Sequence, residues 1–499
     1  MRVVSRLILA VLFAVALVAE GQKAVVPDPA VVGQWSAVAE WPFVAIHAAL
    51  LPNGKIVSWA RKDGVVTIET YVYNPADRSF TKVLNPYAQV FCAGHSFLPD
   101  GTLLVAGGHL KFDFTGEKTT TFFDYRTNAW TKGENMNAGR WYPTTATLSN
   151  GDVVVVSGLI SPTPPVEGGS SINGLPQVWS SGKWRDLDGA RDPQISLYPW
   201  MLLAPNGTVF LAGPSSASAF LDTAGSGKWL PGPDSSVSFR DYGSAVPYEP
   251  GKVLIVGGGD PPVASSETID LNAGKPEWKA AGSLKTARRQ INATMLPDGK
   301  VLVTGGTSGR GFNNVNTPVF DAELWDPATG VWTVMAPAAR PRLYHSVALL
   351  LPDATVLNAG GGLPPWGQPP PPPPPGQPPY EAGPFQNNAQ IYSPPYLFRG
   401  ARPVIKSAPA KVRYAESFFV ETADGGVISD VTLIRLGAVT HAFNQNQGFI
   451  RLKFSVTEGG LTVVAPDRGT IAPPGPYMLF ILNRNGVPSV AKILTVGAP

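Results

Sequence analysis

The chain has 499 residues, of which 53 are Gly and 51 are Pro, and its charged residues (15%) leave a net charge of only +3. This weak charge argues against a nucleic-acid partner, because such binders concentrate Lys and Arg on one face, and the 44% hydrophobic content argues against disorder. Since Gly and Pro are both poor in helix interiors, the composition favours an all-β protein.

The N-terminus has the layout of a secretory signal peptide. Two arginines lie within Met1–Arg6, the apolar run Leu7–Ala19 follows, and Glu20–Lys23 is polar. This pattern predicts a signal peptide over residues 1–23 and a secreted or cell-envelope protein, with an uncleaved N-terminal anchor as the alternative. No other segment reaches about 18 apolar residues, so no further membrane span is expected.

A repeat organises most of the chain. A turn dipeptide, a β-branched strand and a run of small residues recur about every 44 to 56 residues, which is close to the period of kelch-type propeller blades. Asn-Gly and Asp-Gly between apolar runs are the strongest short-range hairpin signal. The seven turns are Asn53-Gly54, Asp100-Gly101, Asn150-Gly151, Asn206-Gly207, Pro250-Gly251, Asp298-Gly299 and Asp353-Ala354.

Seven copies predict a seven-bladed kelch-type β-propeller over residues 24–398. A closed ring removes the exposed edges that an open stack of sheets would present. The Pro-rich segment 364–379 contains the run Pro369–Pro375, which cannot join a strand ladder and favours polyproline II. We interpret it as a stiff surface loop inserted in the last blade rather than as a recognition motif.

The pattern changes over residues 399–499. Shorter alternating strands such as SFFVETA, VTLIRLGAV, FIRLKFSV and YMLFILN follow one another there. About 100 residues of this kind predict a C-terminal immunoglobulin-like β-sandwich.

One position of the repeat is rich in chemically active side chains. It lies eight residues before each turn, where the innermost strand of a blade begins, so its side chains should converge near one mouth of the central channel. The first copy departs, with Ala45 at the position and His47 two residues later. The six other copies have Cys92, Tyr142, Tyr198, Tyr242, Gln290 and His345 there, with Tyr344 just before the last.

A ring of Cys, Tyr and His suits a metal, because imidazole binds copper, zinc and iron and thiolates are soft ligands. Cys92 is the only cysteine, which is unusual for a secreted protein. It is either a buried small hydrophobe or linked to something other than a cysteine. Arg140, Arg240 and Arg342 precede register positions by two or three residues; we expect them to hydrogen-bond between blades rather than to bind substrate.

Four separated segments together resemble the copper-radical oxidases, the family of galactose oxidase and glyoxal oxidase. Arg140-Trp141-Tyr142 and the stretch after Tyr344 are closer to the glyoxal oxidase branch, and the resemblance covers nearly the whole mature chain. The segments are Phe91-Cys92-Ala93-Gly94, Arg140-Trp141-Tyr142, Arg342-Leu343-Tyr344-His345-Ser346 and Thr440-His441.

The resemblance implies a role for each matching residue. Cys92 and Tyr142 would be joined by a thioether bond, with Tyr142 a copper ligand and the carrier of a protein radical. Tyr344 would be the axial ligand and the base that takes the substrate proton. His345 and His441 would complete a site for one copper ion, with His441 reaching it on a loop of the C-terminal domain.

The implied activity is oxidation of small aldehydes of the glyoxal or methylglyoxal type, or of primary alcohols, by O2, with release of H2O2 to a possible extracellular peroxidase. One departure concerns the indole that stacks over the cross-linked tyrosine in galactose oxidase. The matching stretch here, Ser157–Ser161, contains no tryptophan. Galactose is therefore a poor candidate substrate.

Two other functions compete with this one. A non-catalytic kelch propeller would bind carbohydrate or protein through its blade loops, since propellers host many functions. A non-radical mononuclear metal site at the same residues would keep its activity in Cys92→Ser.

Overall fold

The computed structural model describes residues 27–60, 69–110, 114–163, 171–192, 194–362 and 385–497. The predicted signal peptide at residues 1–23 and the Pro-rich insert at residues 364–379 lie outside these ranges. In the described part of the chain, no helix has the length and apolarity that a membrane crossing needs. The helices are single turns: α1 (Pro29–Val32), η1 (Asp188–Ala190), η2 (Pro395–Phe398) and η3 (Gly425–Val427).

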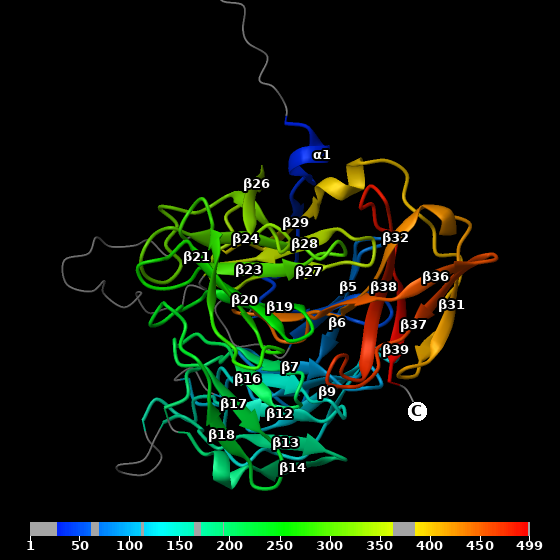
Figure 1. Ribbon diagram of the computed structural model, residues 1–499. Helices are drawn as coiled ribbons and strands as arrows, with labels where there is room; N and C mark the ends of the chain where they lie inside the picture. The colour runs from blue at the N-terminus through cyan, green and yellow to red at the C-terminus, as the bar shows by residue number, and fades with distance from the viewer. Residues whose placement is uncertain are drawn as a thin grey trace, which may run out of the picture.

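Seven antiparallel sheets, counted over the described residues, follow one another along the chain between β3 and β29 (Figure 1). Each sheet is a blade, and in blades 1 to 6 its four propeller strands pair in sequence order. Blade 1 contains β3 (His47–Leu50), β4 (Ile56–Trp59), β5 (Glu69–Asn74) and β6 (Ser79–Leu84). Blade 2 contains β7 (Gly94–Phe97), β8 (Leu103–Ala106), β9 (Thr120–Asp124) and β10 (Ala129–Lys132). Blade 3 contains β11 (Thr144–Thr147), β12 (Val153–Val156), β13 (Gln177–Ser180) and β14 (Lys183–Asp186).

The next three blades repeat this arrangement. Blade 4 contains β15 (Met201–Leu203), β16 (Val209–Leu211), β17 (Ala219–Asp222) and β18 (Lys228–Pro231). Blade 5 contains β19 (Ser244–Glu249), β20 (Lys252–Val256), β21 (Ser265–Asp270) and β22 (Lys279–Ser283). Blade 6 contains β23 (Arg289–Met295), β24 (Val301–Thr307), β25 (Asp321–Asp326) and β26 (Val331–Pro337).

Blade 7 closes the ring by combining both ends of the propeller. The N-terminal strands β1 and β2 pair with β29, with Gln34 opposite Ser393. The closed ring confirms the predicted seven-bladed all-β propeller, whose domain boundaries stay predictions. Blade 7 contains β27 (Ser346–Leu350), β28 (Val356–Gly360), β29 (Asn388–Ser393), β1 (Gln34–Trp35) and β2 (Ala39–Glu40).

The inner hairpin of every blade turns through a left-handed residue. Six copies place glycine there, with φ between +75° and +92°, a region that glycine enters without steric cost. The seventh copy has Ala354, which adopts the same conformation at φ 66°. The turn dipeptides in the sequence therefore mark the backbone geometry that each blade requires.

Two further sheets form the C-terminal β-sandwich, as predicted. A hairpin of β33 (Ala438–Thr440) and β34 (Phe443–Asn444) leaves this unit and extends the sheet of blade 1. The larger sheet contains β30 (Lys411–Val412), β39 (Lys492–Val496), β38 (Gly475–Asn483), β32 (Ile428–Arg435) and β35 (Phe449–Leu452). The smaller one contains β31 (Ser417–Glu421), β37 (Gly460–Val464) and β36 (Phe454–Thr457).

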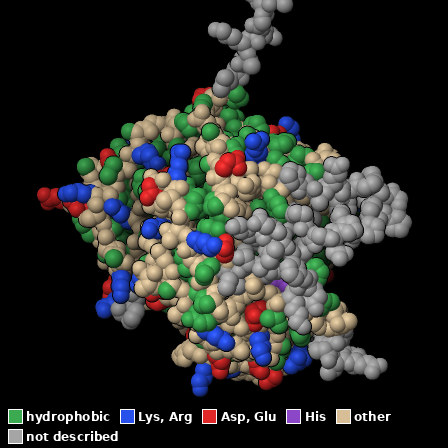
Figure 2. Space-filling model, turned by 180° about the vertical axis from the view of Figure 1, so that it is seen from behind, with side chains coloured by type: hydrophobic (Ala, Val, Ile, Leu, Met, Phe, Trp, Pro, Cys, Tyr) green, Lys and Arg blue, Asp and Glu red, His purple; other side chains and the backbone are tan. Residues whose placement is uncertain are grey.

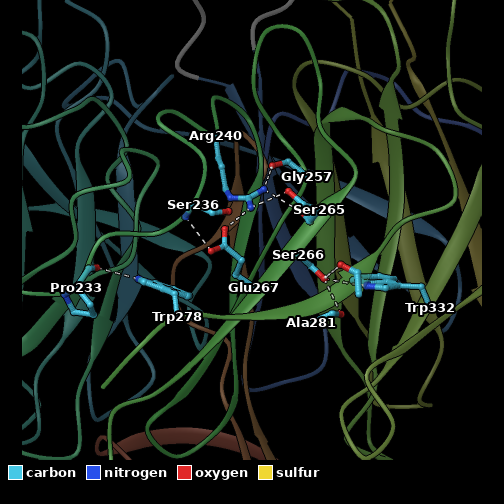
Figure 3. Close-up of polar contacts among 11 residues, drawn as sticks. Pro233, Ser236, Arg240, Gly257, Ser265, Ser266, Glu267, Trp278, Ala281 and Trp332 are labelled. Atoms are coloured by element: carbon cyan, nitrogen blue, oxygen red, sulfur yellow. Dashed lines mark hydrogen bonds and ion pairs between the residues drawn. The ribbon is translucent and has the colours of Figure 1, made fainter. Parts of the chain in front are cut away.

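Buried arginines brace individual blades, as Figure 3 shows for Arg240. Arg240 donates from Nη1 to the carbonyls of Gly257 and Ser265 and forms an ion pair with Glu267 at 2.6 Å, all within blade 5. Arg140 donates from Nη1 to the carbonyls of Ser157 and Asn173 in the segment between β12 and β13 of blade 3. Arg342 donates to those of Gly360 in β28 and Asn388 in β29 of blade 7. At the strand ends, the guanidinium groups donate to these carbonyls the hydrogen bonds that water would otherwise supply.

The same arginines also join neighbouring blades, as expected, but through their backbones. Arg140 N donates to the carbonyl of Glu117 in blade 2 at 3.0 Å, and Arg240 N donates to that of Pro214 in blade 4 at 2.8 Å. The carbonyl of Arg342 accepts from Gly306 N of blade 6 at 2.7 Å.

Tryptophan side chains add further hydrogen bonds between blades. The indole N–H of Trp332 in blade 6 donates to Ser266 of blade 5 at 3.1 Å (Figure 3), and Trp130 of blade 2 donates to Thr70 of blade 1. The outer surface differs from the interior: Lys, Arg, Asp and Glu are scattered over the face in Figure 2 without a zone of one sign. Among the described residues of that face, nothing resembles the basic stripe of a nucleic-acid binder.

Candidate functional site

The register position singled out in the sequence has an unusual backbone. Non-glycine residues rarely adopt positive φ, and bulky ones do so only where surrounding structure holds them there. The conformation recurs at the entry to blades 2 to 7. The residues are Cys92 (φ 63°), Tyr142 (φ 65°), Tyr198 (φ 44°), Tyr242 (φ 52°), Gln290 (φ 61°) and His345 (φ 69°).

Backbone hydrogen bonds join successive register positions across blades. Tyr142 N donates to the carbonyl of Cys92 at 3.0 Å, and Tyr198 N donates to that of Tyr142 at 2.8 Å. Gln290 N donates to the carbonyl of Tyr242 at 2.8 Å. These bonds link neighbouring register positions, which together we call the inner ring, so equivalent residues distant in sequence lie next to one another.

The predicted site residues meet at this ring. Ligand atoms of Cys92, His345 and His441 all lie within 4.8 Å of one another, and all three residues are buried. The hydroxyl groups of Tyr142 and Tyr344 are hydrogen-bonded to each other. The ring of His441 lies 4.6 Å from that of Tyr142 and 4.7 Å from that of His345, measured between centroids. The structure therefore brings all five residues together, and His441, which the repeat could not place, is at the centre.

The β33–β34 hairpin carries His441 into the propeller. Thr440, at the end of β33, pairs with His47 of β3, and His441 follows it with a left-handed φ of 46°. Gln445 fixes the rest of the loop, because its Oε1 accepts hydrogen bonds from the backbone N–H groups of His95 (3.2 Å) and Thr145 (3.1 Å). The C-terminal unit thus completes a site that the propeller alone lacks.

In both His441 and His345, a hydrogen bond places the ring proton on Nδ1. Thr440 Oγ1 donates to the carbonyl of Ile46 at 3.0 Å, so it accepts from His441 Nδ1 at 2.6 Å. His345 Nδ1 donates to the carbonyl of Gly362 at 3.2 Å. In the neutral form of each ring, Nε2 is then the unprotonated nitrogen. A hydrogen bond on the second ring nitrogen is the usual arrangement around metal-ligating histidines.

Burial favours the uncharged forms of Tyr142, Tyr344 and His441. It raises the pKa of the Tyr142 and Tyr344 phenols well above the ordinary value and lowers the pKa of His441 well below it. Two imidazoles, two phenols and a thiol form a donor set suited to copper. A divalent cation between them would favour the phenolate forms.

An indole covers Tyr142, although the stretch Ser157–Ser161 contains none. The Trp141 and Tyr142 rings stack with centroids 3.6 Å apart and planes 16° apart. Trp141 is held by reciprocal backbone hydrogen bonds with Leu159 (2.9 and 2.7 Å). The sequence prediction sought this indole in Ser157–Ser161, whereas the structure places over the ring the tryptophan that directly precedes Tyr142.

Other aromatic groups surround the pair of tyrosines. Tyr198 packs against Tyr142 at 4.5 Å and donates its hydroxyl to the carbonyl of Ala93. Tyr242 meets Tyr344 edge to face at 5.3 Å, and Phe312 does so at 5.6 Å. The site thus has an aromatic wall on the side of blades 4 to 6.

Two family models match the chain. One is described as galactose oxidase-like, Early set domain, and matches residues 402–496; the other is described as glyoxal oxidase N-terminus and matches residues 249–364.

Relatives and a solved structure match over most of the chain. Galactose oxidase of Gibberella zeae is 30% identical, covering 94% of this chain and 71% of its own. Aldehyde oxidase GLOX of Vitis pseudoreticulata is 29% identical, and the alignment covers 94% of this chain and 95% of that relative. A solved structure described as a novel fungal alcohol oxidase with catalytic diversity among the AA5 family, in complex with copper, has a TM-score of 0.81 at 28% identity. It covers 94% of this chain and 100% of its own.

Proposed function

This chain belongs to the family of galactose oxidase and glyoxal oxidase, and from that membership we propose that it is a secreted copper-radical oxidase. Its substrates would be small aldehydes of the glyoxal or methylglyoxal type, or primary alcohols. O2 would be the oxidant and H2O2 the second product, available to an extracellular peroxidase. The predicted signal peptide supports secretion, and relatives named for aldehyde and alcohol oxidation support the substrate class.

Tyr142, Tyr344, His345 and His441 would hold the copper ion. The observation that carries the proposal is the convergence of these side chains with Cys92 in one buried cluster. Bound copper would supply one-electron redox capacity and Lewis acidity that makes a substrate hydroxyl easier to deprotonate. The chain itself must supply the second electron equivalent, the proton acceptor and the exclusion of water.

A Cys92–Tyr142 thioether would supply the second equivalent. Its formation removes hydrogen from the thiol and from a carbon of the phenol ring, creates an S–C bond, and reduces O2 to H2O2. The nearness of Cys92 to the copper donors supports this bond: its Sγ lies 3.7 Å from His441 Nε2. A sulfur substituent on the ring would make the Tyr142 radical easier to form.

Tyr344 and Tyr142 would divide the work on the substrate. As a phenolate, Tyr344 would take the hydroxyl proton, and the radical of Tyr142 would accept a proton and an electron from the adjacent carbon. An alcohol loses two electrons and two protons to become an aldehyde, and a hydrated aldehyde becomes an acid. Reduction of O2 to H2O2 takes up both electrons and both protons. Trp141, stacked on Tyr142, would exclude water from the radical.

Peroxide release tests the proposal. Purified, copper-loaded protein would be offered methylglyoxal, glyoxal, glycerol and galactose in parallel, with Tyr142→Phe as the control. We expect peroxide with the aldehydes and none from the variant. Peptide mass analysis would separate the competing functions: a cross-linked peptide containing Cys92 and Tyr142, two hydrogens lighter than its parts, supports the radical oxidase. Unlinked peptides together with no peroxide would favour a binding propeller, and undiminished activity in Cys92→Ser would favour a non-radical metal site.

A further inference from the structure

The loop that carries Cys92 is held by side chains of the neighbouring blade. At other register positions, such as Tyr142 and Tyr198, the N–H donates to the carbonyl of the preceding register residue. The N–H of Cys92 donates to a side chain, the Nε2 atom of His47 in β3, at 2.9 Å. His47 lies two residues beyond Ala45, the first-copy residue that departs from the pattern.

His47 is itself fixed in one tautomer and one orientation. Because its Nε2 accepts from Cys92, its Nδ1 carries the proton and donates to Nε2 of His95 at 3.2 Å. The imidazole stacks on Trp59, with centroids 4.9 Å and planes 10° apart. His47 and Trp59 are directly opposite partners in the β3–β4 ladder, so their rings share one face of the sheet. Both imidazoles are fully buried and Trp59 is 1% exposed.

Trp59 holds the same loop at a second point. Its indole N–H donates to the carbonyl of Val90 at 2.8 Å, two residues before the N–H that His47 accepts. Residues 90 and 92 are therefore each hydrogen-bonded to a side chain of blade 1. Such support matters because Cys92 has a φ of 63°, where the Cβ of an L-residue is crowded by its own backbone.

We propose that His47, assisted by Trp59, is the positioning residue for the thioether bond. This role rests on the proposed function. Holding Cys92 in the left-handed conformation keeps Sγ beside His345 and His441, in the cluster that contains Tyr142, before any covalent bond exists. The cross-link, once formed, fixes the cysteine by itself. Loss of the His47 acceptor should therefore slow maturation of the enzyme much more than it lowers turnover of matured enzyme.

The test measures the rate of cross-linking separately from activity. Full-length chain, produced without copper, would receive Cu²⁺ in air, and the cross-linked peptide would be quantified over time by mass spectrometry. Misplacing a reacting atom by about 1 Å can cost up to about 100-fold in rate, so we expect His47→Leu to mature at least about tenfold more slowly. His47→Gln should restore much of the rate, because its side-chain oxygen can accept the Cys92 N–H.

Trp59→Phe provides a second, milder variant, because it keeps an aromatic ring and removes the N–H donor. Trp332→Phe is its matched control: it removes an indole hydrogen bond between two other blades, to Ser266, and should mature at the wild-type rate. Circular dichroism and the unfolding midpoint would show that each variant is folded. Matured His47→Gln, isolated after complete cross-linking, should have a kcat close to that of the wild type.

Each outcome bears on one of the two proposals. Absence of the cross-link in the wild-type protein would overturn the proposed function itself. A wild-type cross-link that forms equally fast in His47→Leu would overturn the positioning role alone. Equal slowing in His47→Leu and His47→Gln would also overturn it, because the accepted hydrogen bond would then not be the cause. The positioning role is established if His47→Leu matures slowly, His47→Gln matures faster than His47→Leu, and Trp332→Phe matures at the wild-type rate.

Discussion

Replacing Trp141 tests whether its indole stabilises a radical on Tyr142. The two rings are stacked at 3.6 Å with an interplanar angle of 16°, so most of one face of the phenol is covered. Two backbone hydrogen bonds to Leu159 hold position 141 whatever its side chain. Trp141→Phe and Trp141→Leu should therefore change the stacking partner while leaving the backbone around Tyr142 in place.

The size of the effect follows from the energy of an aromatic pair. Such pairs contribute about 0.5–1.5 kcal/mol beyond their buried area. If that energy favours the radical over the phenol, its loss corresponds to a rise of about 20–60 mV in a one-electron potential, since a tenfold change equals about 59 mV. Trp141→Leu should show the whole rise in potential. Trp141→Phe keeps a smaller ring, so it should show only part of that rise.

Redox titration of the copper-loaded, cross-linked enzyme measures this potential, with the radical followed by its optical absorption. The lifetime of the oxidised form in buffer gives a second readout, which should shorten in the order wild type, Phe, Leu because water gains access to the ring. An unchanged potential together with an unchanged lifetime in Trp141→Leu would refute the assignment of Trp141 as the shielding residue.

Three further substitutions test the framework of the site. Arg288→Met should destabilise the fold by about 3–5 kcal/mol in chemical denaturation, because it leaves the carboxylate of Glu323 buried and unpaired. Gly360→Ala should lower the unfolding midpoint strongly, since its Cβ would lie 1.9 Å from the carbonyl oxygen of Ala45 at a φ of 71°. Gln445→Leu should weaken copper binding, measured by titration with a competing chelator, because the loop that carries His441 loses its acceptor contacts with the propeller.

Each of these has a matched control. The double variant Arg288→Met/Glu323→Met should recover most of the lost stability, and failure to recover would show that the ion pair is not the cause. Gly426→Ala adds a methyl group where no atom lies within 4 Å and φ is not positive, so it should leave the midpoint unchanged. If Gln445→Leu is as stable as the wild type and binds copper with the same affinity, Gln445 does not position the loop that carries His441.

The sequence alone determined the all-β propeller and most of the site. Turn dipeptides are a local signal: a left-handed residue is needed at each hairpin, and glycine meets that need cheaply. Their spacing located the blades, and counting back from them located Cys92, Tyr142 and His345. Because the blades are related by a repeat, one offset in sequence corresponds to one place around the axis, so a local count predicted a long-range neighbourhood.

The tertiary structure alone decided how those residues are supported. Trp141 lies beside Tyr142 in sequence, yet its stacking depends on pairing with Leu159 from another loop. His441 enters the ring because the β33–β34 hairpin adds to blade 1, a pairing between segments about 390 residues apart with no repeat to predict it. The contact of His47 with Cys92 likewise joins two blades. Such contacts depend on side-chain packing and strand pairing between distant segments, and neither leaves a periodic pattern in the sequence.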